Sequence, residues 1–180
     1  RQGEIERFAA VDPLSGRRVL IEALVPPVTR GQAAWQRFER ESRLLATLEA
    51  SPLAGVLEVG EDERGPFRVL ESVEGSSLAE LLEGRPIERV EVYRGLARLV
   101  GALDGAHRVG VVHGGIEPAK IQVGAGGELR LLGFGAGADR RYRAPEQWGA
   151  EEGSIGPWTD IHALGLVLHE VSVGSSPFEG

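Results

Sequence analysis

Apolar residues recur along this chain with two different periods. Near the N-terminus, the run Val19 to Ile21 follows a turn-like stretch at 12–16, and two further β-rich runs at 56–59 and 67–73 flank an acidic, glycine-containing turn at 61–65. Short apolar runs that are bounded by turn residues are typical of strands and hairpins. The first third of the chain is therefore predicted to be mostly sheet.

Helical spacing dominates elsewhere. Residues 32–49 place apolar side chains three and four positions apart with charged residues between them, and the segments 88–108 and 160–173 repeat this spacing. Such a pattern collects the apolar side chains on one face of a helix. We predict one amphipathic helix in the N-terminal part and two long helices in the C-terminal part, arranged as two lobes.

Composition narrows the class of protein. The 180 residues are 42% hydrophobic and 26% charged, which is typical of a globular chain, and the net charge of -7 argues against a nucleic-acid partner. Cysteine is absent, so disulfides and thiolate chemistry are excluded and a cytoplasmic location is predicted. No apolar run approaches the roughly 20 residues that span a bilayer, so we predict no membrane insertion within this sequence.

The beginning of the chain suggests a piece of a longer protein. The sequence starts at Arg1 and contains no methionine. We therefore read it as a fragment, which could be the cytoplasmic portion of a larger, membrane-anchored protein.

Five short motifs and one helix start follow one another along the chain. They are Val19-Leu20-Ile21-Glu22, the helical run Arg37-Phe38-Glu39-Arg40-Glu41, the loop from Val112 to Ile121 that contains His113, Gly133-Phe134-Gly135, Ala144-Pro145-Glu146, and Asp160-Ile161 with Leu164-Gly165. Their order resembles that of the Ser/Thr protein kinases of bacteria, over essentially the whole chain from the second strand onward.

The resemblance implies a fold and a domain division. The expected class is α+β, a protein-kinase-like two-lobed fold with a small β-rich N-lobe and a mainly helical C-lobe. The N-lobe is expected at 1–72, with its one major helix at about 32–49. The partial C-lobe is expected at 73–180, with a degenerate catalytic loop and activation segment, and is truncated after the central helix.

The departures from the family's motifs fall on the residues that phosphoryl transfer requires. That chemistry needs a cation on the phosphates, oxygen ligands on magnesium and a carboxylate that orients the hydroxyl. According to the resemblance, Glu22 replaces the phosphate-binding lysine and Glu117 replaces the lysine of the catalytic loop. Gly115 replaces the aspartate that orients the hydroxyl. Lys120 and Gly133 replace the two metal ligands. Glu22 is expected to repel a triphosphate and Lys120 to repel a metal ion. No catalytic residue and no metal site are predicted.

The expected adenine pocket is also altered. Arg7 stands in place of a valine, Leu20 in place of a small alanine, and Gln122 in place of a leucine that would sandwich the base. The glycine-rich loop that covers the phosphates in the family is not recognisable here. We therefore predict no cofactor, neither ATP nor magnesium.

Two further sets of residues are expected to shape the fold and its contacts. By resemblance, a buried structural stack of side chains joins the lobes and is anchored by an aspartate; its members are Leu45, Leu57, His113, Phe134 and Asp160. The last helix is expected to present an apolar surface for a protein partner or a homodimer; the residues are Leu164, Val167, Leu168 and Val171.

The sequence-based hypothesis for function is a pseudokinase that is not an enzyme and that acts as a protein-binding, scaffold or regulatory module. One alternative is a Ser/Thr-type kinase that uses unconventional residues, with Glu41, Glu117 or Asp139 for the metal and an arginine such as Arg18 for phosphate. Another alternative is a structural remnant within a larger protein.

Overall fold

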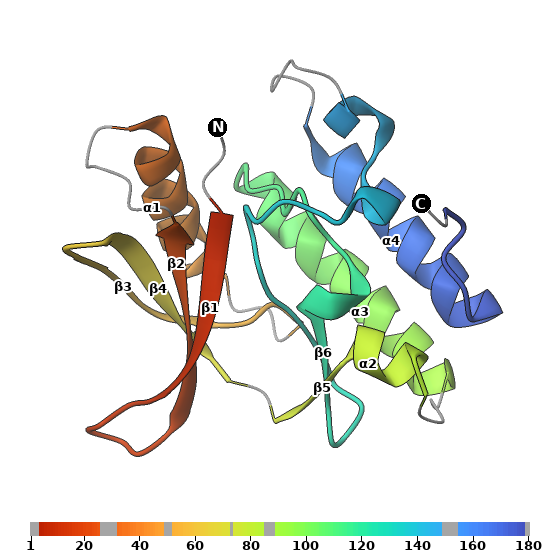
Figure 1. Cartoon of the computed structure of the whole chain (residues 1–180), viewed down its shortest axis with the longest axis horizontal. Coiled ribbons are helices and arrows are strands. Elements are labelled where there is room, and N and C mark those ends of the chain that lie inside the picture. Colours follow the sequence, from red (N-terminus) through yellow and green to blue (C-terminus); the bar gives the residue numbers. More distant parts are fainter. Residues whose placement is uncertain are drawn as a thin grey trace.

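The computed structural model describes residues 4–25, 32–48, 52–72, 74–84, 89–148 and 155–178. A sheet with one helix packed against it lies beside a mainly helical part (Figure 1). The predicted boundary between 1–72 and 73–180 falls at Val73, which lies outside the described residues, and it stays a prediction.

The N-terminal lobe is a four-stranded antiparallel sheet with the strand order β1-β2-β4-β3. The register places Arg7 opposite Glu22 and Glu22 opposite Arg68, so these three side chains form one row across the sheet. Residues that are directly opposite in an antiparallel pair point to the same face. The strands are β1 (Glu4–Val11), β2 (Arg18–Val25), β3 (Val56–Asp62) and β4 (Gly65–Glu71).

Helix α1 (Ala33–Leu45) packs against β3 and β4 and confirms the predicted amphipathic helix. Its buried residues are Trp35, Phe38, Ser42 and Leu45, which follow one another at three- and four-residue spacing. This spacing puts them on one stripe of the helix surface. The helix therefore covers one face of the sheet.

The C-terminal lobe combines a small antiparallel sheet, ordered β5-β6-β7, with helices. A capping box begins α2, because Ser77 accepts from the Glu80 backbone N–H and the Glu80 carboxylate accepts from the Ser77 N–H. The elements are β5 (Gly75–Ser77), α2 (Leu78–Leu82), α3 (Arg89–Arg108), β6 (Ile121–Gly124), β7 (Leu129–Leu131), α4 (Pro157–Val173), and the 3-10 turns η1 (Pro118–Lys120), η2 (Arg140–Tyr142) and η3 (Pro145–Trp148).

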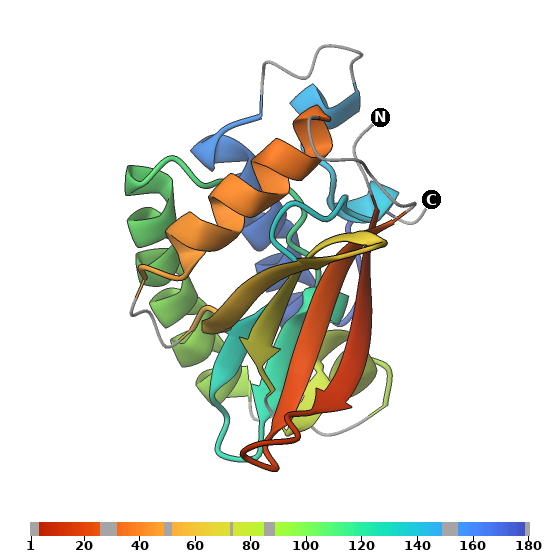
Figure 2. The same cartoon turned by 90° about the vertical axis from the view of Figure 1, so that its left-hand side faces the viewer.

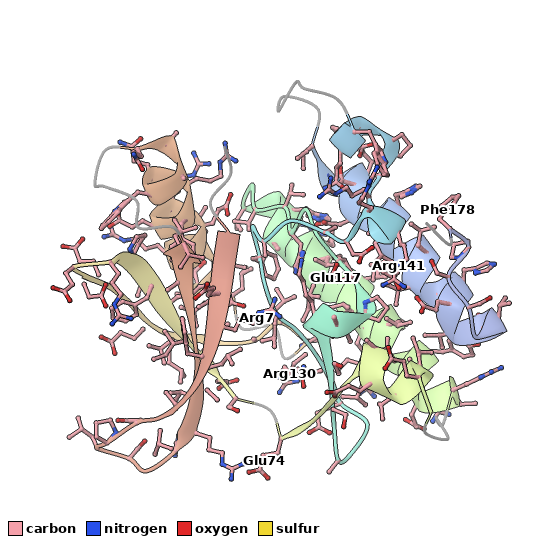
Figure 3. All side chains as sticks on the ribbon, in the orientation of Figure 1. Arg7, Glu74, Glu117, Arg130, Arg141 and Phe178 are labelled. Carbon is pink, nitrogen blue, oxygen red and sulfur yellow. The ribbon has the colours of Figure 1, made fainter. Side chains whose placement is uncertain are left out.

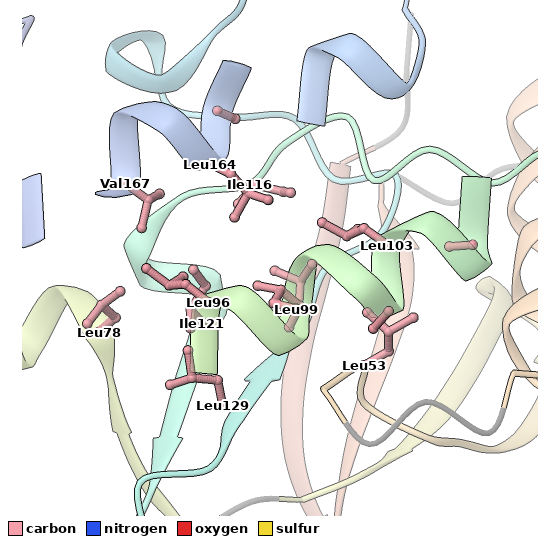
Figure 4. Packing of buried hydrophobic residues seen from close by; sticks show 14 of the residues in the cluster. Leu53, Leu78, Leu96, Leu99, Leu103, Ile116, Ile121, Leu129, Leu164 and Val167 are labelled. Atoms are coloured by element: carbon pink, nitrogen blue, oxygen red, sulfur yellow. The ribbon is translucent and has the colours of Figure 1, made fainter. Parts of the chain in front are cut away.

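The main apolar core lies between α3, α4 and the small sheet (Figure 4). Leu99 and Leu103 of α3 and Val167 of α4 have no solvent exposure. A Cβ at Gly95 would lie 2.4 Å from a Leu129 side-chain carbon, so glycine allows α3 to approach β7 closely. This packing confirms the two predicted C-terminal helices.

The core corrects the predicted surface of the last helix. Leu164, Val167 and Val171 are buried in the core, and only Leu168, which is 45% exposed, faces solvent. The prediction fails for the three buried residues because α4 carries apolar residues on more than one face. The face that includes Leu164 packs into the core.

A β-bulge corrects the predicted stack at Leu57. The pairing of β3 with β4 shifts its register between Val56 and Glu58, and Leu57 is 57% exposed. An extra residue in one strand breaks the in-out alternation of side chains. Val56 packs against the core in this region instead.

Within the described ranges, none of the helices combines the length and the apolar character needed to cross a membrane.

Candidate functional site

The centre of the candidate site is a buried carboxylate between two guanidinium groups. Glu22 is fully buried, and its Oε1 accepts from Arg7 Nε at 2.9 Å. Its Oε2 accepts from Arg68 Nε at 2.8 Å and from Arg68 Nη2 at 2.6 Å. Glu22 was expected to repel a triphosphate, but in the structure the positive charges of two arginines balance its negative charge.

Arg68 also joins the two lobes. Its Nη2 donates to the backbone oxygen of Phe134 at 2.7 Å, and its guanidinium carbon lies 4.8 Å from the centre of the Phe38 ring. Strand β4, helix α1 and the segment at 133–135 thus converge on one side chain. The lobes are held together here by contacts that involve no ligand.

Arg7 occupies the space beside Gly133. The backbone of Gly133 has φ +82°, and a Cβ built on it would lie 2.0 Å from Arg7 Nη2. A positive φ is strongly disfavoured for residues other than glycine. Figure 3 shows Arg7 between the lobes.

The other two residues of the expected adenine pocket lie on strands of the two different lobes. Leu20 is half-buried on β2, opposite Ala9 and Leu70. Gln122 is half-buried on β6, opposite Arg130 on β7. Their predicted effect on adenine binding stays a prediction.

Lys120 brings a second buried cation to the site. Its Nζ donates to the backbone oxygens of Gly115 at 2.8 Å, Ala136 at 3.3 Å and Gly137 at 2.5 Å. It also lies 3.6 Å from Glu117 Oε1. The ammonium group thereby ties the loop at 113–117 to the segment at 135–139.

Glu117 completes this second ion pair. Its Oε2 accepts from the backbone N–H of Asp139 at 2.7 Å, while its Oε1 faces Lys120. The reversed charges at 117 and 120 therefore compensate each other. Position 120 provides an ammonium group, and position 133 is a glycine with the Arg7 guanidinium beside it. Neither position offers the carboxylate or amide oxygen that magnesium prefers.

Asp160 anchors the loop from α4. This fully buried carboxylate accepts from the backbone N–H groups of His113 at 2.9 Å and Gly114 at 2.8 Å, and His107 Nε2 lies 2.7 Å from it. Leu45 belongs to the same buried cluster. Four residues of the predicted stack are thus buried around this loop, without Leu57; their role in folding stays a prediction.

His113 is held neutral. Burial, with Lys120 nearby, keeps the pKa of His113 well below its usual value. Its Nδ1 accepts from the Gly115 N–H at 3.2 Å, so Nε2 carries the proton and donates to the Leu132 oxygen at 2.8 Å. The ring lies 4.6 Å from that of Phe134. Each ring nitrogen is already bonded, which suits a packed histidine better than a proton shuttle.

The residues proposed as substitutes for missing chemistry lie in different places. Arg18 pairs with Glu74 at 3.3 Å, and both are exposed. Glu41 is half-buried beside Gly135, and burial raises its pKa. The sequence-based reasoning missed Arg68, although the strand register would have placed it opposite Glu22.

Among the described residues, no three His, Asp or Glu side chains are grouped so that they could hold a metal ion.

The buried Lys120 leads to a pH-dependent prediction. Burial lowers the pKa of Lys120 from 10.5 to about 8, so between these values the unfolded chain binds more protons than the folded one. The free energy of unfolding is then expected to rise with pH over this window, by up to about 3 kcal/mol. Urea unfolding at about pH 7.5 and about pH 9.5 measures this rise, which Lys120→Met should abolish. Because Lys120 is the only lysine in the chain, an unchanged pH profile in that variant would rule the effect out.

Comparisons with known proteins support the resemblance. Serine/threonine-protein kinase PknL of Mycobacterium tuberculosis is 34% identical, in an alignment that covers 80% of this chain and 40% of the relative. A probable serine/threonine-protein kinase of Streptomyces coelicolor is 28% identical, covering 100% of this chain and 30% of the relative. The chain therefore spans less than half the length of these relatives. No protein-family model matches it.

Solved structures confirm the fold. The crystal structure of the Mycobacterium tuberculosis PknI kinase domain matches with a TM-score of 0.77 and 24% identity, covering 99% of this chain and 71% of that one. The predicted α+β, two-lobed, protein-kinase-like class is correct.

The prediction that the chain is not an enzyme is wrong by these comparisons. The relatives are named serine/threonine-protein kinases, which points to a kinase rather than to a non-enzyme. The substitution of individual charged groups does not by itself establish the loss of activity. Several of the substituted groups are also paired, as Glu117 is with Lys120 and Glu22 with Arg7.

Proposed function

Because the chain belongs to the bacterial Ser/Thr protein kinase family, we propose a role within that family: a protein-binding, regulatory module. Ion pairs of the protein itself occupy the cleft, by which we mean the space between the two lobes around Glu22 and Lys120. This cleft does not bind Mg-ATP in the family's manner. The observation that carries the proposal is the buried Glu22 between Arg7 and Arg68.

The proposal follows from the energetics of buried charge. In the family, one strand lysine contacts the phosphates and also pairs with a glutamate of the helix. Here both arginines are bound to a fully buried carboxylate, and drawing them toward a phosphate would leave Glu22 without a partner. Removing one partner of a buried ion pair costs about 3–5 kcal/mol. A nucleotide would have to offset that cost before it gained any affinity.

The second ion pair supports the same view. The cations next to position 133 are Arg7 and Lys120, and a divalent ion placed between them would meet two like charges. Lys120 already bridges the two segments that a metal would otherwise connect. The closed arrangement of loop and segment therefore needs no ligand.

A thermal-shift titration with ATP tests the proposal. At millimolar ATP, the unfolding midpoint is expected to be the same with magnesium as with EDTA, because a ligand stabilises a protein only by binding its folded state. The PknL kinase domain, treated in the same way, serves as the positive control. A magnesium-dependent rise of the midpoint for this chain would refute the proposal.

Phosphate transfer by unconventional residues is the second candidate function, and the names of the relatives favour it. Of the residues considered for it, Glu117 connects the loop at 113–117 to the segment at 135–139. This candidate predicts transfer of labelled γ-phosphate to the domain or to a protein substrate, and loss of that transfer in Glu117→Gln. Transfer that depends on Glu117 would establish this function over the first.

A further inference from the structure

The face of the N-terminal sheet that points away from the ion pairs has an apolar centre. The register forms the row Phe8, Ile21 and Val69 across β1, β2 and β4, and beside it a row with Ala23 and Phe67. These positions alternate with Arg7, Glu22 and Arg68, so they point to the opposite face. Figure 2 shows the four strands in front of the C-terminal lobe.

This outer face is open and hollowed. Phe8 is 45% exposed, and a hollow of about 390 Å³ lies over Phe8, Ile21 and Phe67. A second hollow of about 950 Å³ lies over Ile21, Val69 and Leu57 and extends to Ala125 and Glu128 of the C-terminal lobe. The bulge that turns Leu57 outward thus adds an apolar side chain to this face. Exposed apolar surface of this kind is typical of interaction sites.

The surface has a fixed shape at its centre. A Cβ at Gly60 would lie 2.5 Å from the ring of Phe67, so that ring lies across the glycine of the neighbouring strand. Glycine leaves room there for the aromatic ring. The hollow beside Phe67 is therefore defined by packing within the sheet.

Acidic residues surround the apolar centre. Among the residues that line the two hollows, carboxylates outnumber guanidinium groups by seven to four. Glu6, Glu58, Asp62 and Glu71 stand at exposed positions of this face. A second copy of this chain would bring like charges together across a symmetric interface. A partner with basic residues would meet opposite charges.

We propose that this outer face, formed by Phe8, Ile21, Leu57, Phe67 and Val69 with its acidic rim, binds an amphipathic helix of a partner protein. The apolar side of that helix lies on the sheet, and lysine or arginine residues flank it. A helix laid on a sheet face is a common way to bury apolar surface. The inference rests on the proposed protein-binding role and specifies its surface and partner.

A pair of synthetic peptides tests the charge requirement. One is a helical peptide of about 18 residues, or five turns, with leucine on one face and lysine on the other. The second has glutamate in place of every lysine. In fluorescence anisotropy, the lysine peptide is expected to bind at least about tenfold more tightly, and added salt should weaken it. Equal affinity of the two peptides would overturn the proposal.

Matched variants locate the binding. Phe8→Asp and Glu71→Lys are expected to weaken the lysine peptide about tenfold. Val173→Asp and Glu83→Lys change residues of the same kind, exposed on α4 and beside α2, and should leave affinity unchanged. Equal losses in both pairs would refute the location. A wild-type dimer that Phe8→Asp dissociates in sedimentation would also refute it, in favour of a second copy.

The two proposals fail separately. A magnesium-dependent rise of the unfolding midpoint with ATP would refute the proposed cleft behaviour and would not affect the peptide result. Equal binding of the two peptides, without such a rise, would refute only the proposed docking surface.

Discussion

Replacing Glu22 by alanine is expected to lower the free energy of unfolding by about 3–5 kcal/mol. The substitution leaves Arg68, which is almost completely buried, without the carboxylate that accepts two of its hydrogen bonds. Arg7 loses the same partner beside Gly133. Urea unfolding of the wild type and the variant at neutral pH measures the loss.

The control for this prediction is another glutamate of the same sheet. Glu58 is exposed on β3, and Glu58→Ala is expected to change stability by no more than about 0.5 kcal/mol. The double variant Glu22→Leu with Arg68→Met should be more stable than the single variant Glu22→Leu, because it does not leave the Arg68 guanidinium buried and unpaired. Similar losses of unfolding free energy for Glu22→Ala and Glu58→Ala would show that the buried ion pair stabilises the protein no more than an exposed glutamate does.

Replacing Asp160 by alanine is expected to cost at least about 3 kcal/mol of stability, because hydrogen bonds to a charged group contribute roughly 1.5–3 kcal/mol each. The variant removes the acceptor for the His113 and Gly114 N–H groups and the partner of His107. Hydrogen exchange should accelerate at the amides of residues 113 and 114. Chemical unfolding and exchange together separate a local opening from a global loss of stability.

Asp104 provides the matched control for Asp160. It pairs with Arg108 on the exposed surface of α3, so Asp104→Ala should change stability by less than about 1 kcal/mol. The conservative variant Asp160→Asn keeps one carbonyl oxygen and should fall between the wild type and the alanine variant. A stable Asp160→Ala protein with unchanged exchange at 113 and 114 would contradict the anchoring role.

Local patterns predicted β2, β3 and β4 and the three longer helices, but not the small sheet β5-β6-β7 or the short helix α2. Helix α1 has a single buried stripe at three- and four-residue spacing, so its sequence determines which face packs inward. Helix α4 is different, because Ile161 and Leu168 are exposed while Leu164 and Val167 are buried. A helix with apolar residues on several faces does not reveal its orientation through periodicity alone. Which face of α4 is buried depends on the position of α3, against which α4 packs.

The site was harder to predict than the fold, because its partners are distant in sequence. Glu22 and Arg68 are 46 positions apart, and they meet only through the pairing of β2 with β4. Lys120 looked like a charge that repels a metal, yet three backbone oxygens bind its ammonium group. Motif comparison identifies which residue is replaced. It does not say which neighbour compensates for the new charge.

The left-handed backbone at Gly133 constrains how this sequence can evolve. Any larger residue there meets both an unfavourable φ and the guanidinium of Arg7. An aspartate at 133 would displace the guanidinium of Arg7 or draw it into a new ion pair, and either change takes one partner away from Glu22. The three positions are coupled, so their mutational effects are not additive. The effect of a substitution at one of these positions therefore depends on which residues already stand at the other two.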